Sequence, residues 1–341
     1  MEDQPFDMDA LADELHELVP GFSGLHAVEK FNTGQSNPTY RVEADSGNYV
    51  LRAKPPGTLL KSAHQVDREY RVMKALSENN VPVPKVYGLS GEDSAIGRMY
   101  FVMELVEGRI FWDPALPEVS KQERAAIYDG MNDVLARLHS VDPEAAGLAD
   151  YGRPGNYFAR QIRRWSEQYI ASKTEELPDM DRLMDWLWDN LPDDDGMVSV
   201  VHGDYRLDNM IFHSDENRVA AVLDWELSTL GDPIADFSYL MLNWHNPHDG
   251  RAGLLGLDLA ELGIPTQDEA VERYVARTGY PVPPMDWYFA YNLFRLAGIM
   301  QGIKKRVIDG TASSAHAKSM SERVAPLVER AYHFAKEAGM D

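Results

Sequence analysis

Asp204, Asn209 and Asp224 are the residues whose types and spacing point most directly to chemistry. Two short apolar runs close to them, Met210–Phe212 and Val219–Leu223, predict strands because each is compact and bounded by polar loop residues. If the strands form one antiparallel hairpin, the three polar side chains come to the same edge. Two carboxylates and an amide oxygen at one edge suit a hard cation such as Mg²⁺. Magnesium in turn suits phosphoryl transfer, where catalysis is mostly positioning and charge neutralisation.

This segment resembles a known family. The pattern HGDxxxxN, followed by a hydrophobic strand and an Asp, is similar to that of the aminoglycoside phosphotransferase and choline kinase group, relatives of protein kinases. The resemblance implies that Asp204 orients or deprotonates the acceptor hydroxyl, and that Asn209 and Asp224 bind magnesium. A surface hairpin capped by polar residues is the alternative, which the shared spacing disfavours.

The downstream run GDPIADF is a second hallmark of that family. Asp232 and Pro233 predict a helix start, with Asp as the N-cap and proline at the first helical position. The resemblance gives Asp236 a structural role, in which its carboxylate braces the catalytic loop through backbone N–H groups. Glu226 could assist magnesium or cap a turn, and we favour the turn.

The N-terminal region predicts an amphipathic helix over residues 7–19 and then nucleotide-binding strands. The strands are predicted over three β-rich runs, residues 25–31, 39–43 and 49–53. The turn NTGQSN between the first two strands could lay backbone N–H groups over phosphates, although with one glycine a simple hairpin turn fits equally well. Because the family has a nucleotide-covering loop there, four positions are expected to bind the nucleotide: Gly34, Gln35, Ser36 and Asn37.

A cation on the third strand is expected to contact the nucleotide phosphates, as in kinase-like folds. The register of YVLR favours Arg52, and Lys54, on the same face, is the reserve. The following helix, Val66–Glu78, carries Glu69, which the resemblance makes the partner that braces the strand cation. Exposed strand-end charges and a solvated Glu69 are the alternatives.

The run FVMELVEG is predicted to link two lobes. It ends a strand pair, Lys85–Leu89 with Met99–Glu104, and its position implies that the backbone of Glu104 and Val106 meets the adenine ring. Beyond it the pattern becomes mostly helical. We therefore expect an N-lobe over residues 1–107 and a helical C-lobe, carrying the hairpin and the acceptor site, over residues 108–341.

Two features of the predicted C-lobe raise the question of what it binds. Helices are expected over six segments: Ser120–His139, 157–170, Glu175–Asp195, 266–278, 285–305 and 314–337. Arg160, Arg163 and Arg164 share one face of the second of these helices and could hold an anionic acceptor, although ion pairing with nearby acids is the more ordinary interpretation. His245 and His248 lie in a loop-rich stretch without a well-spaced third ligand, so we expect surface histidines and no metal site there.

Composition excludes several classes of function. Of 341 residues, 44% are hydrophobic and 26% charged, and the net charge of −22 disfavours nucleic acid and anionic membranes as partners. This acidity could favour a cationic substrate or simply aid solubility. The chain has no cysteine, and no apolar run approaches a membrane span. An acidic start without Lys or Arg is unlike a signal peptide, so a cytoplasmic protein is expected.

Taken together, the resemblance implies an α+β, bilobal protein-kinase-like fold that binds ATP and Mg²⁺ and phosphorylates a small-molecule hydroxyl. Longer stretches, such as YGRPGNYFARQIRRW, resemble the branch whose kinase domains are fused to acyl-CoA dehydrogenases, which implies a hydroxyacyl-CoA acceptor. The acidity fits an aminoglycoside or amino alcohol. A catalytically silent nucleotide-binding module that acts through partners is the alternative. ATP versus GTP and the oligomeric state stay open.

Overall fold

The computed structural model describes residues 6–31, 37–56, 65–310 and 320–341. The chain divides into two compact units, each interrupted in sequence. The first contains residues 1–112, 118–151 and 206–228, and the second contains residues 113–117, 152–205 and 229–341. Among the described residues, no helix is both long and apolar enough to cross a membrane.

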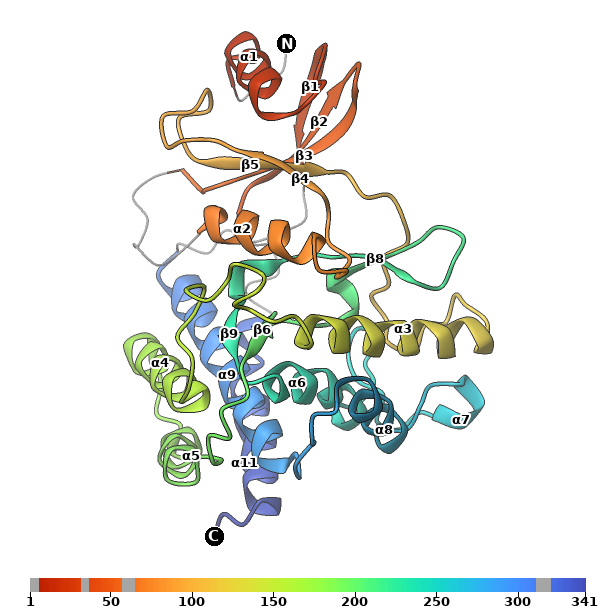
Figure 1. Ribbon diagram of the computed structural model, residues 1–341. Helices are drawn as coiled ribbons and strands as arrows, with labels where there is room; N and C mark the ends of the chain where they lie inside the picture. Colours follow the sequence, from red (N-terminus) through yellow and green to blue (C-terminus); the bar gives the residue numbers. More distant parts are fainter. Residues whose placement is uncertain (1–5, 32–36, 57–64, 311–319) are drawn as a thin grey trace. The chain divides into compact units, whose positions relative to one another are not determined.

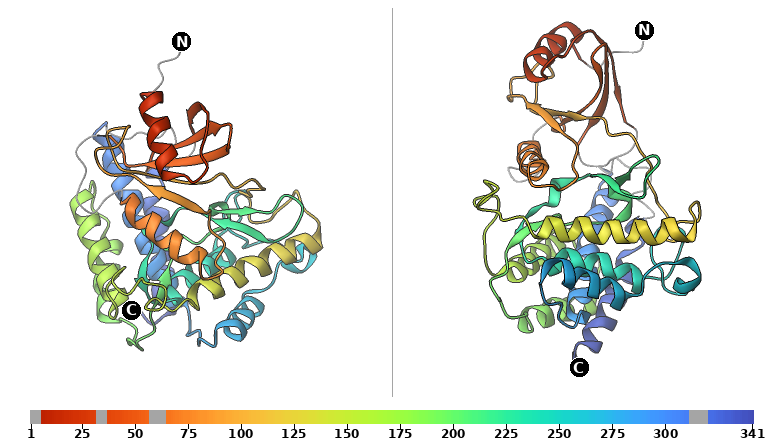
Figure 2. Two further views of the ribbon diagram at one scale, coloured as in Figure 1. Left: turned by 45° about the horizontal axis from the view of Figure 1, so that its top comes forward. Right: turned by 45° about the vertical axis from the view of Figure 1, so that its right-hand side comes forward.

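The first unit is built on an antiparallel sheet with strand order β1-β2-β3-β5-β4. Its strands are β1 (Leu25–Lys30), β2 (Thr39–Ala44), β3 (Gly47–Ala53), β4 (Val86–Leu89) and β5 (Tyr100–Glu104). Helix α1 (Met8–Leu18) begins at the N-cap Asp7 and buries Leu11 and Leu15 in one core with the sheet. Helix α2 (Val66–Ser77) packs beside β4 and β5 (Figures 1 and 2).

The rest of the first unit carries the hairpin found in the sequence. Strands β7 (Met210–Phe212) and β8 (Val219–Val222) are antiparallel, as expected, and are flanked by the short 3₁₀ turns η1 (Leu207–Asn209) and η2 (Trp225–Leu227). Helix α3 (Lys121–His139) packs against β8. Ser120 and Glu123 form the expected capping box at its start, each side chain accepting the other residue's backbone N–H.

The second unit is mainly helical and is organised around α9 (Asp286–Ile308), which runs beside α11 (Val324–Glu337) (Figure 1). Its other helices are α4 (Tyr157–Ser172), α5 (Pro178–Asp189), α6 (Ile234–His245), α7 (Leu259–Leu262) and α8 (Gln267–Thr278). Phe158 of α4 makes edge-to-face contacts with Trp287 and Tyr291 of α9. Strands β6 (Ser199–Val201) and β9 (Thr229–Gly231) pair in this unit, and the sequence analysis did not predict β9.

Most sequence-based element predictions match these bounds within one to three residues. Helix α6 is assigned from Ile234, but Pro233 already has helical backbone angles and the Asp232 carboxylate accepts the Ile234 N–H at 2.8 Å. The sequence predicts that the loop-rich stretch with His245 and His248 covers residues 242–265, which is wrong at its start because α6 continues to His245. Residues 314–319 of the last predicted helix lie outside the described residues, and α11 begins at Val324.

The segment after β5 packs tightly on the β7–β8 hairpin at Gly108, and this packing predicts a stability difference. A Cβ at Gly108 would lie 2.1 Å from the Phe212 carbonyl oxygen, whereas at Gly130 of α3 the nearest atom is 3.5 Å away. We expect Gly108→Ala to lower the free energy of unfolding by roughly 1–3 kcal/mol. Gly130→Ala should be neutral or stabilising by about 0.5–1 kcal/mol. Urea unfolding of both variants checks this, and equal stabilities would contradict it.

Candidate active site

Asn209 and Asp224 flank the hairpin of the first unit, as the sequence predicts. The Leu223 N–H donates to the Asn209 carbonyl oxygen at 2.8 Å, which ties the end of β8 to the residue that precedes β7. Asp224 follows directly and has φ +66°, in the left-handed region that a residue with a Cβ adopts only at a cost of about 1–3 kcal/mol. Both polar residues therefore stand at one end of the hairpin, on backbone held by its own hydrogen bonds.

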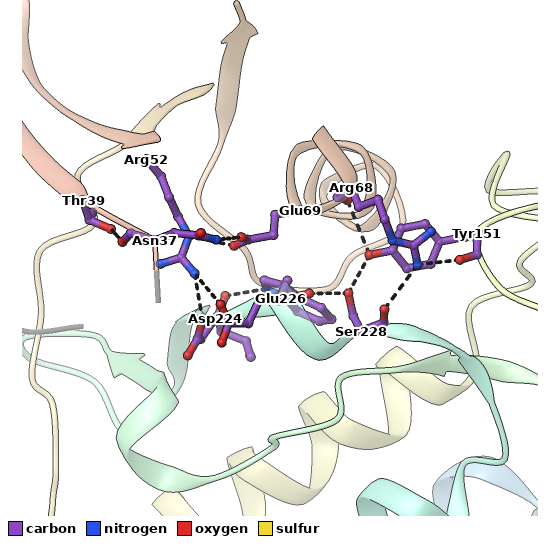
Figure 3. Close-up of polar contacts among 11 residues, drawn as sticks. Asn37, Thr39, Arg52, Arg68, Glu69, Tyr151, Asp224, Glu226 and Ser228 are labelled. Atoms are coloured by element: carbon purple, nitrogen blue, oxygen red, sulfur yellow. Dashed lines mark hydrogen bonds and ion pairs between the residues drawn. The ribbon is translucent and has the colours of Figure 1, made fainter. Parts of the chain in front are cut away.

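Arg52 on β3 reaches the same end of the hairpin (Figure 3). Its side chain is 14% exposed; Nε lies 2.8 Å from Oε2 of Glu69, and a terminal nitrogen lies 2.9 Å from Oδ1 of Asp224. Oε2 of Glu226 is 3.8 Å from the same terminal nitrogen. The ion pair predicted between Arg52 and Glu69 is present. A solvated Glu69 is wrong, because its side chain is 2% exposed.

Glu69 is held from its other side by Asn37, whose side-chain amide donates to Oε1 at 2.7 Å (Figure 3). Burial raises the pKa of Glu69 to about 7, although the neighbouring Arg52 acts to lower it. Asn37 was expected to bind the nucleotide, and the structure shows its side chain holding Glu69. The other loop positions of that prediction lie outside the described residues: Gly34, Gln35 and Ser36.

The charges in this cluster fit a divalent cation. Among the described residues, Arg52 faces the carboxylates of Glu69, Asp224 and Glu226, which together raise the pKa of Arg52 although burial alone lowers it. Three carboxylates face one guanidinium, so the cluster keeps a surplus of negative charge even where Glu69, with its raised pKa, is only partly ionised. The oxygens of Asp224 and Asn209 at the hairpin end are the hard ligands that Mg²⁺ prefers, so the residues present fit the ion.

Four further positions of the first unit were considered for the nucleotide or its metal ion. Lys54, the reserve for Arg52, pairs with Glu92, so Arg52 is the cation held in the cluster. Glu104 ends β5, and its N–H donates to the Lys85 carbonyl at 2.8 Å; Val106 follows in the linking segment. Glu226 lies in η2 with its carboxylate toward Arg52, so the prediction that it mainly caps a turn misses this contact.

Asp204 belongs to the second unit, where it follows β6 and is positioned by its neighbours. The buried Asp236 carboxylate accepts the N–H groups of His202 at 2.5 Å and Gly203 at 2.8 Å, which is the brace predicted from the sequence. The Asp204 N–H in turn donates to Nδ1 of His202 at 3.1 Å. The loop that carries Asp204 is therefore held by charge-assisted hydrogen bonds from its backbone N–H groups to the Asp236 carboxylate.

Sequence reasoning missed two residues beside Asp204. The hydroxyl of Tyr239 donates to Oδ1 of Asp204 at 2.9 Å. The buried Arg295 of α9 donates to the Gly203 carbonyl and lies over the Tyr239 ring, 5.6 Å from its centroid. Tyr239 lies three residues after Asp236 on α6, so the shared helix face was a usable signal. Nothing local in the sequence pointed to Arg295.

The three arginines proposed for an anionic acceptor have different surroundings on α4. Arg163 is exposed and pairs with Glu167 at 3.4 Å, which matches the ordinary interpretation. Arg160 donates to the Arg153 carbonyl. Arg164 lies over the Trp165 ring at 5.2 Å, and desolvation together with the nearby Arg295 lowers its pKa. The acceptor role of these residues stays a prediction.

The two histidines considered as a metal pair have other partners. His245 is half-buried and contacts the rings of Phe289 and Phe334 at centroid distances of 4.6 and 5.5 Å, so it is less exposed than the expected surface histidine. His248 lies 2.9 Å from Oδ1 of Asp113. In the part of the chain that the structure describes, no group of three or more His, Cys, Asp or Glu residues could hold a metal ion. The fit to Mg²⁺ at the hairpin end rests instead on one carboxylate and one amide oxygen, those of Asp224 and Asn209.

Comparison with known proteins identifies the family. The model of the phosphotransferase enzyme family APH matches residues 27–283. The chain belongs to this family. Mouse acyl-CoA dehydrogenase family member 10 is 43% identical over 337 residues, 96% of this phosphotransferase-family chain and 31% of the mouse protein. Rat acyl-CoA dehydrogenase family member 11 is 43% identical over 331 residues, 95% of this chain and 42% of the rat protein. The chain thus spans less than half the length of these curated relatives.

Solved structures agree with the family. A candidate aminoglycoside phosphotransferase from Ralstonia eutropha is 50% identical with a TM-score of 0.89, covering 97% of this chain and 99% of that chain. A spectinomycin phosphotransferase solved with ADP and spectinomycin is 10% identical with a TM-score of 0.64, covering 97% and 99%, and shows the fold alone. The α+β, kinase-like fold class and the resemblance to the dehydrogenase-fused branch are confirmed. The lobe boundary at residue 107 stays a prediction.

The raised pKa of Glu69 predicts a pH dependence of stability. Because the folded-state pKa of about 7 lies above the ordinary value of 4.5, the folded state binds more protons than the unfolded state between these pH values. Through this group, stability therefore falls as pH rises from about 4.5 to about 7. We expect Glu69→Gln to remove that fall, measured by urea unfolding at several pH values. Glu78→Gln, an exposed change just beyond α2, is the control, and parallel wild-type and Glu69→Gln profiles would contradict the prediction.

The contact between Tyr239 and Asp204 predicts a kinetic effect. A hydrogen bond to a charged group is worth about 1.5–3 kcal/mol, so Tyr239→Phe should lower the phosphotransfer rate by about 10- to 100-fold while the protein stays folded. Steady-state kinetics measure this once an acceptor is known. Tyr288→Phe, at another buried tyrosine of the second unit, should leave the rate near wild type. Equal rates for both variants would show that Tyr239 does not position Asp204.

Proposed function

We propose that this member of the phosphotransferase family uses ATP and Mg²⁺ to transfer the γ-phosphate to a hydroxyl group of a small molecule. The cluster of Arg52 with Glu69 and Asp224 carries the proposal. It combines a braced cation, which can contact phosphates, with carboxylate and amide oxygens at the hairpin end, and it bears a surplus negative charge that a divalent cation would balance.

Each residue has a defined role in the proposed reaction. Asp204 accepts or orients the proton of the acceptor hydroxyl, with Tyr239 fixing its carboxylate. Arg52 offsets phosphate charge, and Glu69 keeps the guanidinium oriented. Asn209 and Asp224 would hold magnesium, which when bound supplies charge neutralisation at the β- and γ-phosphates. The backbone of Glu104 and Val106 is proposed to meet the adenine ring.

Two acceptor classes have support. The net charge of −22 favours a cationic acceptor such as an aminoglycoside or amino alcohol. Desolvation and the like charge of the nearby Arg295 lower the pKa of Arg164, and a place with two neighbouring cations favours an anionic acceptor such as a hydroxyacyl-CoA. The similarity to acyl-CoA dehydrogenase family members 10 and 11 also points to the second class. We propose a small-molecule acceptor and let one experiment choose the class.

The test is ATP consumption with magnesium across a panel that pairs aminoglycosides and amino alcohols with hydroxyacyl-CoA thioesters. We expect acceptor-stimulated turnover with one class. Asp204→Ala should lower it by at least about 100-fold, because a positioned acid–base group contributes 10²–10⁴-fold. Asp224→Ala should abolish the magnesium-dependent turnover of ATP.

A matched control lies in the same hairpin. Asp215 is exposed near the tip, where it contacts Ser214, and Asp215→Ala should leave turnover unchanged. Turnover that survives in Asp204→Ala would contradict the catalytic role, and unchanged magnesium dependence in Asp224→Ala would contradict the metal role. ATP binding without turnover anywhere on the panel would favour a silent nucleotide-binding module.

A further inference from the structure

Helix α2 is attached to the hairpin end at a second place, away from the ion pair of Glu69. Arg68 is the neighbour of Glu69 on α2, and it extends toward Tyr151 while Glu69 extends toward Arg52 (Figure 3). A terminal nitrogen of Arg68 donates to the Tyr151 carbonyl at 2.6 Å, and the guanidinium lies 4.1 Å from the centroid of the Tyr151 ring. The same nitrogen lies 3.5 Å from the Ser228 carbonyl oxygen.

Tyr151 continues this chain of contacts to the turn that follows Asp224 (Figure 3). The hydroxyls of Tyr151 and Ser228 lie 2.6 Å apart, and the Ser228 hydroxyl donates to the Trp225 carbonyl at 2.5 Å. Because the single hydroxyl proton of Ser228 is used in the hydrogen bond to the Trp225 carbonyl, the Tyr151 hydroxyl is the donor in its contact with Ser228. The indole N–H of Trp225 donates to the Val222 carbonyl at 3.0 Å, which closes the turn around Asp224.

The contacts are protected from water. Tyr151 is 1% exposed, Ser228 5% and Trp225 1%. Burial raises the pKa of Tyr151 to about 12, so its hydroxyl stays protonated and can donate at neutral pH. Removing either hydroxyl would break the buried contact between Tyr151 and Ser228. Ser228 would keep its hydrogen bond to the Trp225 carbonyl, and the Tyr151 hydroxyl would keep the longer one to the Arg68 carbonyl at 3.4 Å.

The backbone conformation of Asp224 depends on contacts such as these. A non-glycine residue at φ +66° keeps that conformation only where its surroundings fix it. The turn formed by residues 225–228 is pinned by its own hydrogen bonds and, through Tyr151 and Arg68, to α2. Since Arg68 and Glu69 are adjacent on one rigid helix, any displacement of α2 from the turn would also move Glu69 relative to Asp224.

We infer that Arg68, Tyr151 and Ser228 are positioning residues, which lock α2 to the turn after Asp224 and so hold Arg52, Glu69 and Asp224 in place before a nucleotide binds. We call these three residues the α2 lock. The inference rests on the proposed function for its kinetic consequences, but the lock itself is a property of the free protein. With the α2 lock formed, Arg52 and the carboxylates of Glu69 and Asp224 are already in contact, and no ordering step is needed to bring them together.

The test uses the full chain with Tyr151→Phe, Ser228→Ala and the double variant. Each single variant should raise the KM for Mg·ATP by about 3- to 10-fold, the range expected for one net hydrogen bond, and leave the KM for the acceptor unchanged. The double variant should be no worse than the poorer single variant, because both changes break the same contact. Ser228→Thr, which keeps the hydroxyl, should restore the wild-type value.

Tyr70→Phe is the matched control, because Tyr70 lies on the same helix and its ring packs on Phe101 away from the lock. It should leave both KM values unchanged. Lock variants that lose stability but keep the wild-type KM for Mg·ATP would overturn the inference, since they would show a merely structural role. Additive effects of Tyr151→Phe and Ser228→Ala would also overturn it.

Hydrogen exchange of the free protein separates failure of the lock from failure of the proposed function. Tyr151→Phe should speed exchange in α2 and in residues 222–228 together, while β1 and β2 keep wild-type rates. Unchanged exchange in α2 and the turn would overturn the lock, whether or not nucleotide binds. If calorimetry found no Mg·ATP binding to the wild type, the proposed function would fail, and the exchange measurement would still decide the lock.

Discussion

The guanidinium of Arg52 is the charge on which the arrangement of the first unit depends. A buried cation is retained only when carboxylates and hydrogen bonds replace the water it has lost. Glu69 comes from α2 and Asp224 from the end of the β7–β8 hairpin, so satisfying one side chain requires three separate segments to meet. Among the described residues of this cluster, carboxylates outnumber cations. A further positive charge would therefore be stabilised there.

In the second unit, the buried charge that needs partners is negative. Its buried Asp236 is satisfied by the N–H groups of His202 and Gly203, which lie directly before Asp204. Here the carboxylate orders backbone and leaves the chemistry to its neighbour. Tyr239 and Arg295 complete the support, one through the carboxylate of Asp204 and the other through the Gly203 carbonyl. In both units, a buried charged group holds another residue of the candidate site in place.

Separation along the chain explains why some of these supporting residues are difficult to predict from the sequence. Asp236 and Tyr239 share a helix face at a spacing of three residues, and Arg68 is next to Glu69. Arg295 is 92 residues from the carbonyl it contacts, and Tyr151 is 77 residues from Ser228. The first two pairs follow from helix geometry, whereas the last two arise only when distant segments pack.

The sequence by itself determined the local elements, the family resemblance and the types of residue at the site, because helix caps, hairpin turns and motif spacing are short-range properties. It predicted the hairpin that carries Asn209 and Asp224, the brace by Asp236, and the partnership of Arg52 with Glu69. Tertiary structure decided that Asn37 holds Glu69, that Glu226 faces Arg52, that His245 packs among aromatic rings, and that α2 is locked through Tyr151. Those outcomes depend on which buried groups must find partners after the chain has folded, and such partners are set by packing in three dimensions, which periodicity along the chain does not encode.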